Sequence, residues 1–152
     1  MLTRYQYPEI IRANAYLDQG HKTYAIPLYA SRVSAGYPTS ADDYIDQAIY
    51  LAQDLVKNPA STFLVIASGD SMINAGIQSG DMLVVDKQIE ATNGRIVIAA
   101  IDSELTVKRL SIEEDSMQLL PENPNYKPIL ITPDQHVVIW GVVTFVIARA
   151  CH

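Results

Sequence analysis

Residues 95–110 of this chain read RIVIAAIDSELTVKRL, and this stretch decides the fold. Two runs rich in Val, Ile and Leu, Arg95–Ile101 and Glu104–Leu110, lie on either side of the polar pair Asp102-Ser103. Short runs of β-branched and aliphatic residues bounded by turn residues are typical of β-strands. The stretch therefore predicts two consecutive strands separated by a tight turn.

The same pattern continues on both sides of this stretch, from about residue 60 to residue 149. Turn residues such as Ser79-Gly80-Asp81, Asn93-Gly94 and Asn123-Pro124 separate short runs that are rich in Val and Ile. The predicted strands are Phe63–Ala67, Met82–Val85, Arg95–Ile101, Glu104–Leu110, Met117–Leu120, Ile129–Thr132 and Val137–Ala148. The sequence thus predicts a mainly β body of short strands, without internal repeats.

The first part of the chain has a different pattern. Residues 1–40 carry scattered tyrosines and three prolines but no sustained apolar period, apart from one possible short helix over residues 10–17, so we expect a flexible arm there. From Ser40, which forms a capping-box pattern with Asp43, apolar residues recur at helical spacing up to Asn58-Pro59. These residues are Ile45, Ala48, Ile49, Ala52, Leu55 and Val56. We therefore expect an arm over residues 1–40 and a domain over residues 41–152 that begins with a helix.

Composition excludes several classes of protein. The chain has 152 residues, of which 49% are hydrophobic, which fits one globular domain with an arm. Its net charge of -6 has the wrong sign for binding to phosphates, so no direct sequence-specific DNA binding is expected. Cys151 is the only cysteine, and His21, His136 and His152 are far apart in sequence, so we expect no disulfide, metal site or cofactor.

No segment of the sequence looks like a membrane span. The first ten residues, MLTRYQYPEI, contain no apolar signal segment. The longest apolar stretch, residues 137–148, is interrupted by Gly141 and Thr144 and is shorter than the ~20 residues that a bilayer span needs. With a single cysteine, the sequence fits a cytoplasmic protein without a membrane anchor.

Two polar side chains could form a site for acyl transfer. Ser71 follows an apolar strand within ASGDSM, where a strand end beside a glycine can expose a hydroxyl and surround it with main-chain N–H groups. A period of two places Lys108 on the strand face of Glu104 and Thr106. A lysine that is neutral because of burial can accept a proton from a serine hydroxyl. Each residue alone fits a simpler role, a turn-capping serine or a solvated strand lysine.

Four segments in order make the pair more specific. They are SGDSM (residues 68–72), GDMLVVDK (80–87), NGRIVIAAIDSELTVKRL (93–110) and LLPENPNYKPI (119–129). Together they resemble the C-terminal domain of the LexA and UmuD family of self-cleaving regulators, a compact S24-like and signal-peptidase-like β domain. The resemblance implies that Ser71 is the nucleophile and Lys108 the general base of a Ser/Lys dyad.

The resemblance also implies a cleavage site. This family cuts its own chain at an Ala-Gly or Cys-Gly bond upstream of the serine, and Ala35-Gly36 lies 35 residues before Ser71. The residues that follow, YPTSADDY, are similar to those after the cleavage site in UmuD proteins. Gly36 would let the backbone approach a narrow cleft closely. Main-chain N–H groups of Ser71 and Met72 are the candidate oxyanion donors.

Length favours one branch of the family. LexA-type repressors carry a DNA-binding helix-turn-helix domain before the scissile bond, and only 35 residues precede Gly36. The chain therefore resembles UmuD, the accessory subunit of an error-prone translesion polymerase in the SOS response. By this resemblance we expect a homodimer, cleavage promoted by a RecA filament on single-stranded DNA, and a UmuC-like Y-family polymerase subunit as partner.

Three alternatives remain open at this point. A LexA-like transcriptional regulator of the DNA-damage response would keep the cleavage domain and gain DNA binding through its arm or a partner. A membrane signal peptidase shares the Ser/Lys chemistry but needs a membrane segment. A protein that uses the fold only for dimerisation would not need the intact Ser71 and Lys108.

Overall fold

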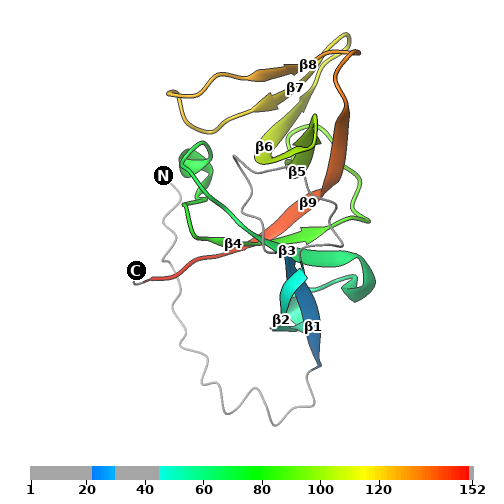
Figure 1. Cartoon of the computed structure of the whole chain (residues 1–152), viewed down its shortest axis with the longest axis vertical. Coiled ribbons are helices and arrows are strands. Elements are labelled where there is room, and N and C mark those ends of the chain that lie inside the picture. Colours follow the sequence, from blue (N-terminus) through cyan, green and yellow to red (C-terminus); the bar gives the residue numbers. More distant parts are fainter. Residues whose placement is uncertain (1–21, 30–44, 151–152) are drawn as a thin grey trace.

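The computed structural model describes residues 22–29 and 45–150, and this part of the chain is mainly β, as predicted (Figure 1). Its strands are β1 (Thr23–Tyr29), β2 (Ile45–Ala52), β3 (Thr62–Ile66), β4 (Met82–Asp86), β5 (Ile96–Ile101), β6 (Glu104–Ile112), β7 (Met117–Leu120), β8 (Ile129–Ile131) and β9 (Val137–Ile147). In the described part of the chain, three short 3-10 helices lie between strands: η2 (Gln53–Leu55), η3 (Pro59–Ser61) and η4 (Ile73–Ala75). Within these residues, all nine strands join one sheet in the order β2-β1-β3-β4-β9-β5-β6-β7-β8.

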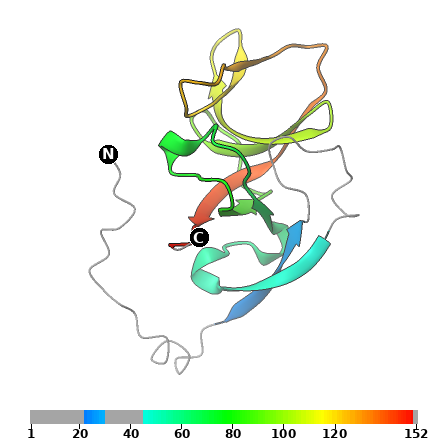
Figure 2. The ribbon, with the colours of Figure 1, turned by 60° about the vertical axis from the view of Figure 1, so that its left-hand side comes forward.

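Strand β9 connects the two halves of the sheet. It pairs antiparallel with β4 on one side and with β5 on the other, and its register shifts along both neighbours. Figure 2 shows β9 running from the upper half, formed by β5 to β8, down to β4 in the lower half. A Cβ at Gly141 would lie 2.7 Å from Val85 Cγ1 and 2.9 Å from the Asp86 carbonyl oxygen. Only glycine therefore allows β9 to pass so close to β4.

Three hydrophobic clusters support the sheet. The largest lies beneath the loop between β3 and β4 and includes Phe63, Met72 and Leu105. The second lies under β1 and β2, and the third lies between β5, β6 and β7. Met72 comes directly after Ser71 and is 2% exposed, so burial of its side chain anchors the loop that carries the serine.

The two consecutive strands predicted within residues 95–110 form the hairpin β5–β6. Ile101 pairs with Glu104, and the two residues between them, Asp102 and Ser103, have φ angles of 47° and 74°. Positive φ at both central residues is the geometry of a two-residue turn that matches the twist of its strands. The other strands predicted downstream of residue 60 are also confirmed, with ends that differ by a few residues.

The helix predicted after Ser40 is wrong, because residues 45–52 form strand β2. Ile49 and Leu51 lie on the side of the second cluster, whereas Tyr50 between them is 74% exposed. This alternation has a period of two, which is the period of a strand. Because Ala48 and Ala52 are apolar, the same residues also fit a helical period. Pairing with β1 decides in favour of the strand.

The arm predicted for residues 1–40 contains a strand that the sequence analysis missed. Strand β1 pairs antiparallel with β2 and meets β3 in parallel at Leu28 and Leu64. Ile26 is 0% exposed, and Leu28 and Tyr29 are also buried. Pro27 lies inside β1, and its presence had argued against a strand. The short helix predicted over residues 10–17 and the Ala35-Gly36 bond lie outside the described residues.

Candidate active site

The serine lies in a loop that is closed at its base by main-chain hydrogen bonds. Between β3 and β4, the Ala67 N–H donates to the Asp81 carbonyl and the Gly80 N–H donates to the Ala67 carbonyl, both at 2.8 Å. Gly69 has a φ of 77°, a conformation that favours glycine and turns the chain towards Ser71. Ser71 is buried, with 8% of its surface exposed.

The lysine lies on a central strand. Lys108 pairs with Val97 across the β5–β6 hairpin and is 7% exposed. Its neighbours on the strand, Leu105 and Val107, pack into the largest hydrophobic cluster on the other face. The alternation in ELTVKRL therefore directs the Lys108 side chain to the strand face opposite Leu105 and Val107, as predicted, and on that face it reaches Ser71.

The two side chains meet. Lys108 Nζ lies 3.0 Å from Ser71 Oγ, 2.7 Å from Thr106 Oγ1 and 3.1 Å from the Val107 carbonyl oxygen. A charged ammonium group donates to all three of these oxygens. A neutral amine keeps only two N–H bonds, so it can donate to Thr106 and Val107 while its lone pair accepts the Ser71 hydroxyl proton. The same arrangement therefore accommodates both protonation states of the lysine.

Burial sets the charge of this lysine. Removal of the amine from water disfavours its charged form and lowers the pKa of Lys108 below the ordinary lysine value. A larger fraction of Lys108 is thus neutral at a given pH than for a solvated lysine. Because only the neutral amine can accept a proton, burial favours the general base that the sequence analysis predicted.

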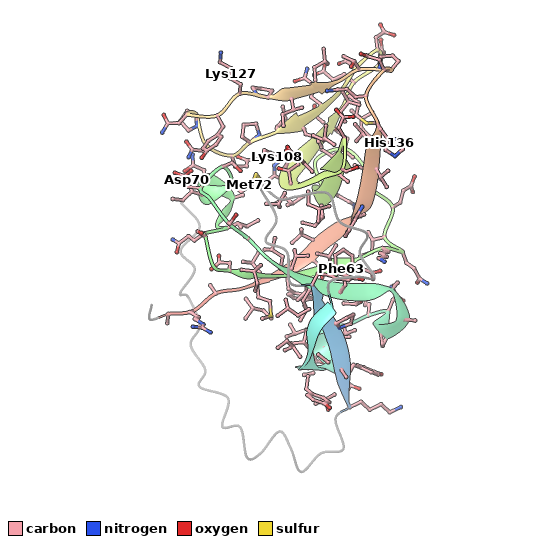
Figure 3. All side chains as sticks on the ribbon, viewed as in Figure 1. Phe63, Asp70, Met72, Lys108, Lys127 and His136 are labelled. Atoms are coloured by element: carbon pink, nitrogen blue, oxygen red, sulfur yellow. The ribbon has the colours of Figure 1, made fainter. Side chains whose placement is uncertain are left out.

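A cleft of about 450 Å³ opens beside the pair. Ile101, Leu105 and Ile129 form part of its apolar wall, while Asp70 and Lys127 are polar groups that also line it. In Figure 3, Asp70, Met72 and Lys108 lie close together, Lys127 lies on the loop above them, and His136 lies apart from all of these residues. A cleft of this size next to a hydroxyl and a base can receive a short extended peptide segment.

A second loop holds the serine loop in place, and sequence reasoning identified it only as a turn within a family motif. The Glu122 N–H donates to the Ser71 carbonyl at 2.8 Å, and Asn123 Nδ2 donates to the Asp70 carbonyl at 2.9 Å. Tyr126 Oη donates to the Asp70 carboxylate at 2.5 Å, and this bond raises the pKa of Tyr126. The only sequence signal for this role was the turn Asn123-Pro124 within the segment LLPENPNYKPI, and the burial of Asn123 comes from the structure.

The other residues considered from sequence lie elsewhere. His136 is exposed at the end of a turn, where its main-chain N–H donates to Asp102. Cys151, His21 and His152 lie outside the described residues. Among residues 22–29 and 45–150, no group of three His, Cys, Asp or Glu side chains could hold a metal ion. In the same part of the chain, no helix is long and apolar enough to cross a membrane.

A mainly β domain in which a serine hydroxyl contacts a buried lysine beside a cleft defines a class, the serine peptidases of the Ser/Lys type. Comparison with known proteins gives the family: residues 27–144 match Peptidase S24-like, and the chain belongs to this family. The resemblance to the LexA and UmuD family and the prediction of a self-cleaving serine peptidase are thereby confirmed.

Individual relatives distinguish the branches of the family. The chain is 43% identical to protein ImpA of Escherichia coli over 136 residues, which covers 86% of this chain and 88% of that protein. It is 41% identical to protein MucA of Escherichia coli over 124 residues, or 81% and 84% of the two chains. It is also 45% identical to the LexA repressor of Stenotrophomonas maltophilia (strain R551-3), but that match covers 52% of the repressor. ImpA and MucA are UmuD-family proteins, and each is matched over more than four fifths of its length, so the UmuD-like branch is the better match, as predicted.

Proposed function

We propose that this chain cuts itself at the Ala35-Gly36 bond, with Ser71 as nucleophile and Lys108 as general base. The observation that carries the proposal is the 3.0 Å contact between Lys108 Nζ and Ser71 Oγ, made by a lysine whose pKa is lowered by burial. The cleft beside this pair is the place where the upstream segment would bind in extended form.

The reaction has two stages. Neutral Lys108 accepts the Ser71 hydroxyl proton as Oγ attacks the carbonyl carbon of Ala35, and main-chain N–H groups of Ser71 and Met72 stabilise the oxyanion. The tetrahedral intermediate then collapses: the C–N bond breaks, and Lys108 returns its proton to the nitrogen of Gly36, which leaves as an amine. Water attacks the acyl-serine ester in the second stage, Lys108 takes one of its protons, and Ser71 Oγ regains a proton as residues 1–35 are released.

This cut would separate strand β1 from the rest of the sheet. Strand β1 precedes the proposed bond, and its residues Ile26, Leu28 and Tyr29 are buried against strands that follow the bond. Burial of each such side chain is worth ~1.5–3 kcal/mol. Release of the fragment 1–35 from the processed form 36–152 therefore requires loss of this packing after the peptide bond has been cut.

The biological role that we infer is SOS mutagenesis in the cytoplasm. A RecA filament on single-stranded DNA would promote cleavage by stabilising the conformer whose scissile segment occupies the cleft. The processed form would act as a homodimer and as accessory subunit of a Y-family, UmuC-like polymerase. Phe145 and Val146 on β9, which are exposed, are apolar surface available for such contacts, and the net charge of -6 fits protein partners better than direct DNA binding.

A LexA-like regulator is the second candidate, and the identity to the LexA repressor is the observation in its favour. Operator binding by the uncleaved chain would support it. An uncleaved chain that shows no preference for any DNA sequence at moderate salt would leave the polymerase role as the only candidate.

The test of self-cleavage is incubation of the purified full chain between about pH 7 and about pH 10.5, with mass spectrometry of the products. The neutral fraction of Lys108 grows with pH, so the rate should rise and then level off, with a midpoint below the ordinary lysine pKa because the pKa of Lys108 is lowered. Fragments 1–35 and 36–152 are expected from the parent chain.

Ser71→Ala is the control and should yield neither fragment. The proposal would be wrong if the chain stayed intact at every pH even with an activated RecA filament. It would also be wrong if Ser71→Ala cleaved as fast as the parent, because the serine would then not be the nucleophile.

A further inference from the structure

The direction of the candidate oxyanion donors depends on two peptide groups. Each peptide group is planar, and the described residues contain no cis peptide bonds, so each C=O and the N–H that follows it point in opposite directions. The Ser71 N–H is therefore oriented by whatever holds the Asp70 carbonyl. In the same way, the Met72 N–H is oriented by whatever holds the Ser71 carbonyl.

Both carbonyls are held by neighbouring residues of one distant loop. The Asp70 carbonyl accepts a hydrogen bond from Asn123 Nδ2 at 2.9 Å, and the Ser71 carbonyl accepts one from the Glu122 N–H at 2.8 Å. Within the serine loop itself, the Ile73 N–H also donates to the Asp70 carbonyl, at the longer distance of 3.2 Å. The Asn74 N–H donates back to the Glu122 carbonyl at 2.9 Å. The loop thus binds the serine segment on both sides of Ser71.

The loop is itself rigid. Pro121 and Pro124 fix φ on either side of Asn123. Asn123 Oδ1 accepts the Asn125 N–H at 3.0 Å, and the Tyr126 N–H donates to the Asn123 carbonyl at 3.1 Å. Asn123 is 8% exposed. Because its Oδ1 accepts from Asn125 and its Nδ2 donates to the Asp70 carbonyl, both ends of the side-chain amide form hydrogen bonds. A carboxylate at this position could accept from Asn125 but could not donate to Asp70.

The loop is also connected to the strand of the lysine. The Glu122 carboxylate accepts a hydrogen bond from Arg109, which follows Lys108 on β6. In Figure 3 the chain around Lys127, just after this loop, lies above the segment of Asp70 and Met72. The loop is thus in contact with both elements that carry the Ser/Lys pair.

We propose that Asn123 is a positioning residue for self-cleavage, which orients the Ser71 N–H towards the developing oxyanion through its hydrogen bond to the Asp70 carbonyl. The proposal rests on the proposed function, because it assigns a purpose to the candidate oxyanion donors. Among residues 22–29 and 45–150, neither the Ser71 N–H nor the Met72 N–H has a hydrogen-bond acceptor, so both can serve a substrate. Preorganised donors of this kind stabilise a transition state because they need no reorientation during the reaction.

The first test compares the pH profiles of Asn123→Asp and Asn123→Ala with that of the parent chain. Asn123→Asp keeps the acceptor for Asn125 and loses the donor, while Asn123→Ala loses the donor without adding a charge. Removal of an oxyanion donor costs about 10²–10³-fold in rate, so misorientation of one should slow the plateau rate of both variants by about 10–100-fold. The midpoint of the profile should not move in Asn123→Ala, because Lys108 keeps its surroundings, whereas the added carboxylate of Asn123→Asp favours the charged lysine and should raise the midpoint.

Asn125→Ala is the matched control, because this exposed residue on the same loop takes part only through its main-chain N–H. Its rate should equal that of the parent. If both Asn123 variants cleaved within about twofold of the parent, the proposal would be wrong while self-cleavage by Ser71 would stand. Failure of the proposed function is a different result, namely no Ser71-dependent cleavage in the parent itself.

The second test is amide NMR in a Ser71→Ala background, which prevents cleavage. Addition of Asn123→Asp should shift the amide resonances of residues 71 and 72 and leave those of β5 and β6 in place. Unchanged resonances at residues 71 and 72 would overturn the proposal. Loss of the β5 and β6 resonances would also overturn it, because Asn123 would then hold the fold rather than the oxyanion donors.

Discussion

Two hairpins of the same sheet contribute in opposite ways. The hairpin β5–β6 is joined by the two-residue turn Asp102-Ser103, and its second strand carries Lys108. The strands β1 and β2 also pair antiparallel, with a register shift between Leu28 and Tyr29, and residues 30–44 separate them in sequence. The first hairpin carries the proposed general base, whereas the second buries apolar side chains upstream and downstream of the proposed cleavage bond.

The comparison teaches that burial has opposite effects on a charged and on an aliphatic side chain of the same sheet. Lys108 is buried at a cost, since burial disfavours its charged form, and this cost makes it usable as a base. Ile26 on β1 is buried with a gain, because an aliphatic side chain leaves water. Changes at Lys108 should therefore affect the reaction, and changes at Ile26 should affect folding and release of the fragment.

The largest expected effect concerns the Ser/Lys pair. Ser71→Ala and Lys108→Ala should each reduce the self-cleavage rate by about 10³-fold or more, and the double variant should be no slower than either single one, because residues that act as a unit are not additive. The measurement is the rate of fragment formation by mass spectrometry at the optimal pH.

The thermal unfolding midpoints of these variants serve as the control. They should not fall below that of the parent, because Lys108→Ala also removes a buried amine. A double variant much slower than both single variants would mean that Ser71 and Lys108 act in independent steps. The assignment of one reaction step to β6 and the serine loop together would then be wrong.

The next effect lies on β1. Ile26 is 0% exposed, so Ile26→Ala should reduce the free energy of unfolding by ~2–5 kcal/mol, from lost burial and the cavity that remains. The measurement is urea unfolding of the uncleaved chain in a Ser71→Ala background.

A matched variant is Tyr50→Ala on the neighbouring strand, where the side chain is 74% exposed, and it should change this free energy by less than ~1 kcal/mol. In the cleavable background, Ile26→Ala should also speed separation of fragment 1–35 from the rest. Equal unfolding free energies for the two variants would mean that β1 does not hold the lower half of the sheet.

The smallest effect concerns the second acceptor of the lysine. Thr106→Val keeps the shape of the side chain but removes the oxygen that lies 2.7 Å from Lys108 Nζ. The neutral amine then loses one of the two partners that aim its lone pair at Ser71, and we expect cleavage to slow by about 10-fold. Rates of Thr106→Ser, which retains the hydroxyl, should lie near the parent. If Thr106→Val cleaved at the rate of the parent, the Val107 carbonyl alone would be sufficient to orient the lysine.

Local pattern made much of the fold predictable. A run such as IVIAAI that is followed by a two-residue turn and ELTVKRL favours an antiparallel hairpin, so β5, β6 and the face of Lys108 followed from period and turn chemistry. Residues 45–52 fitted both the period of a helix and the period of a strand, and the prediction of a helix there was wrong. Strand β1 was missed because its pattern is short and includes Pro27.

By itself, the sequence determined the mainly β class, the strand that presents Lys108 and, through the order of its motifs, the family. Only the tertiary structure decided that Lys108 Nζ and Ser71 Oγ lie 3.0 Å apart, since they belong to elements separated by 37 positions. It also decided that β1 and β2 are strands and that Asn123 holds the Asp70 carbonyl. The physical reason is common to all three: each depends on a partner distant in sequence, and a period shows which face a side chain takes but not what it meets there.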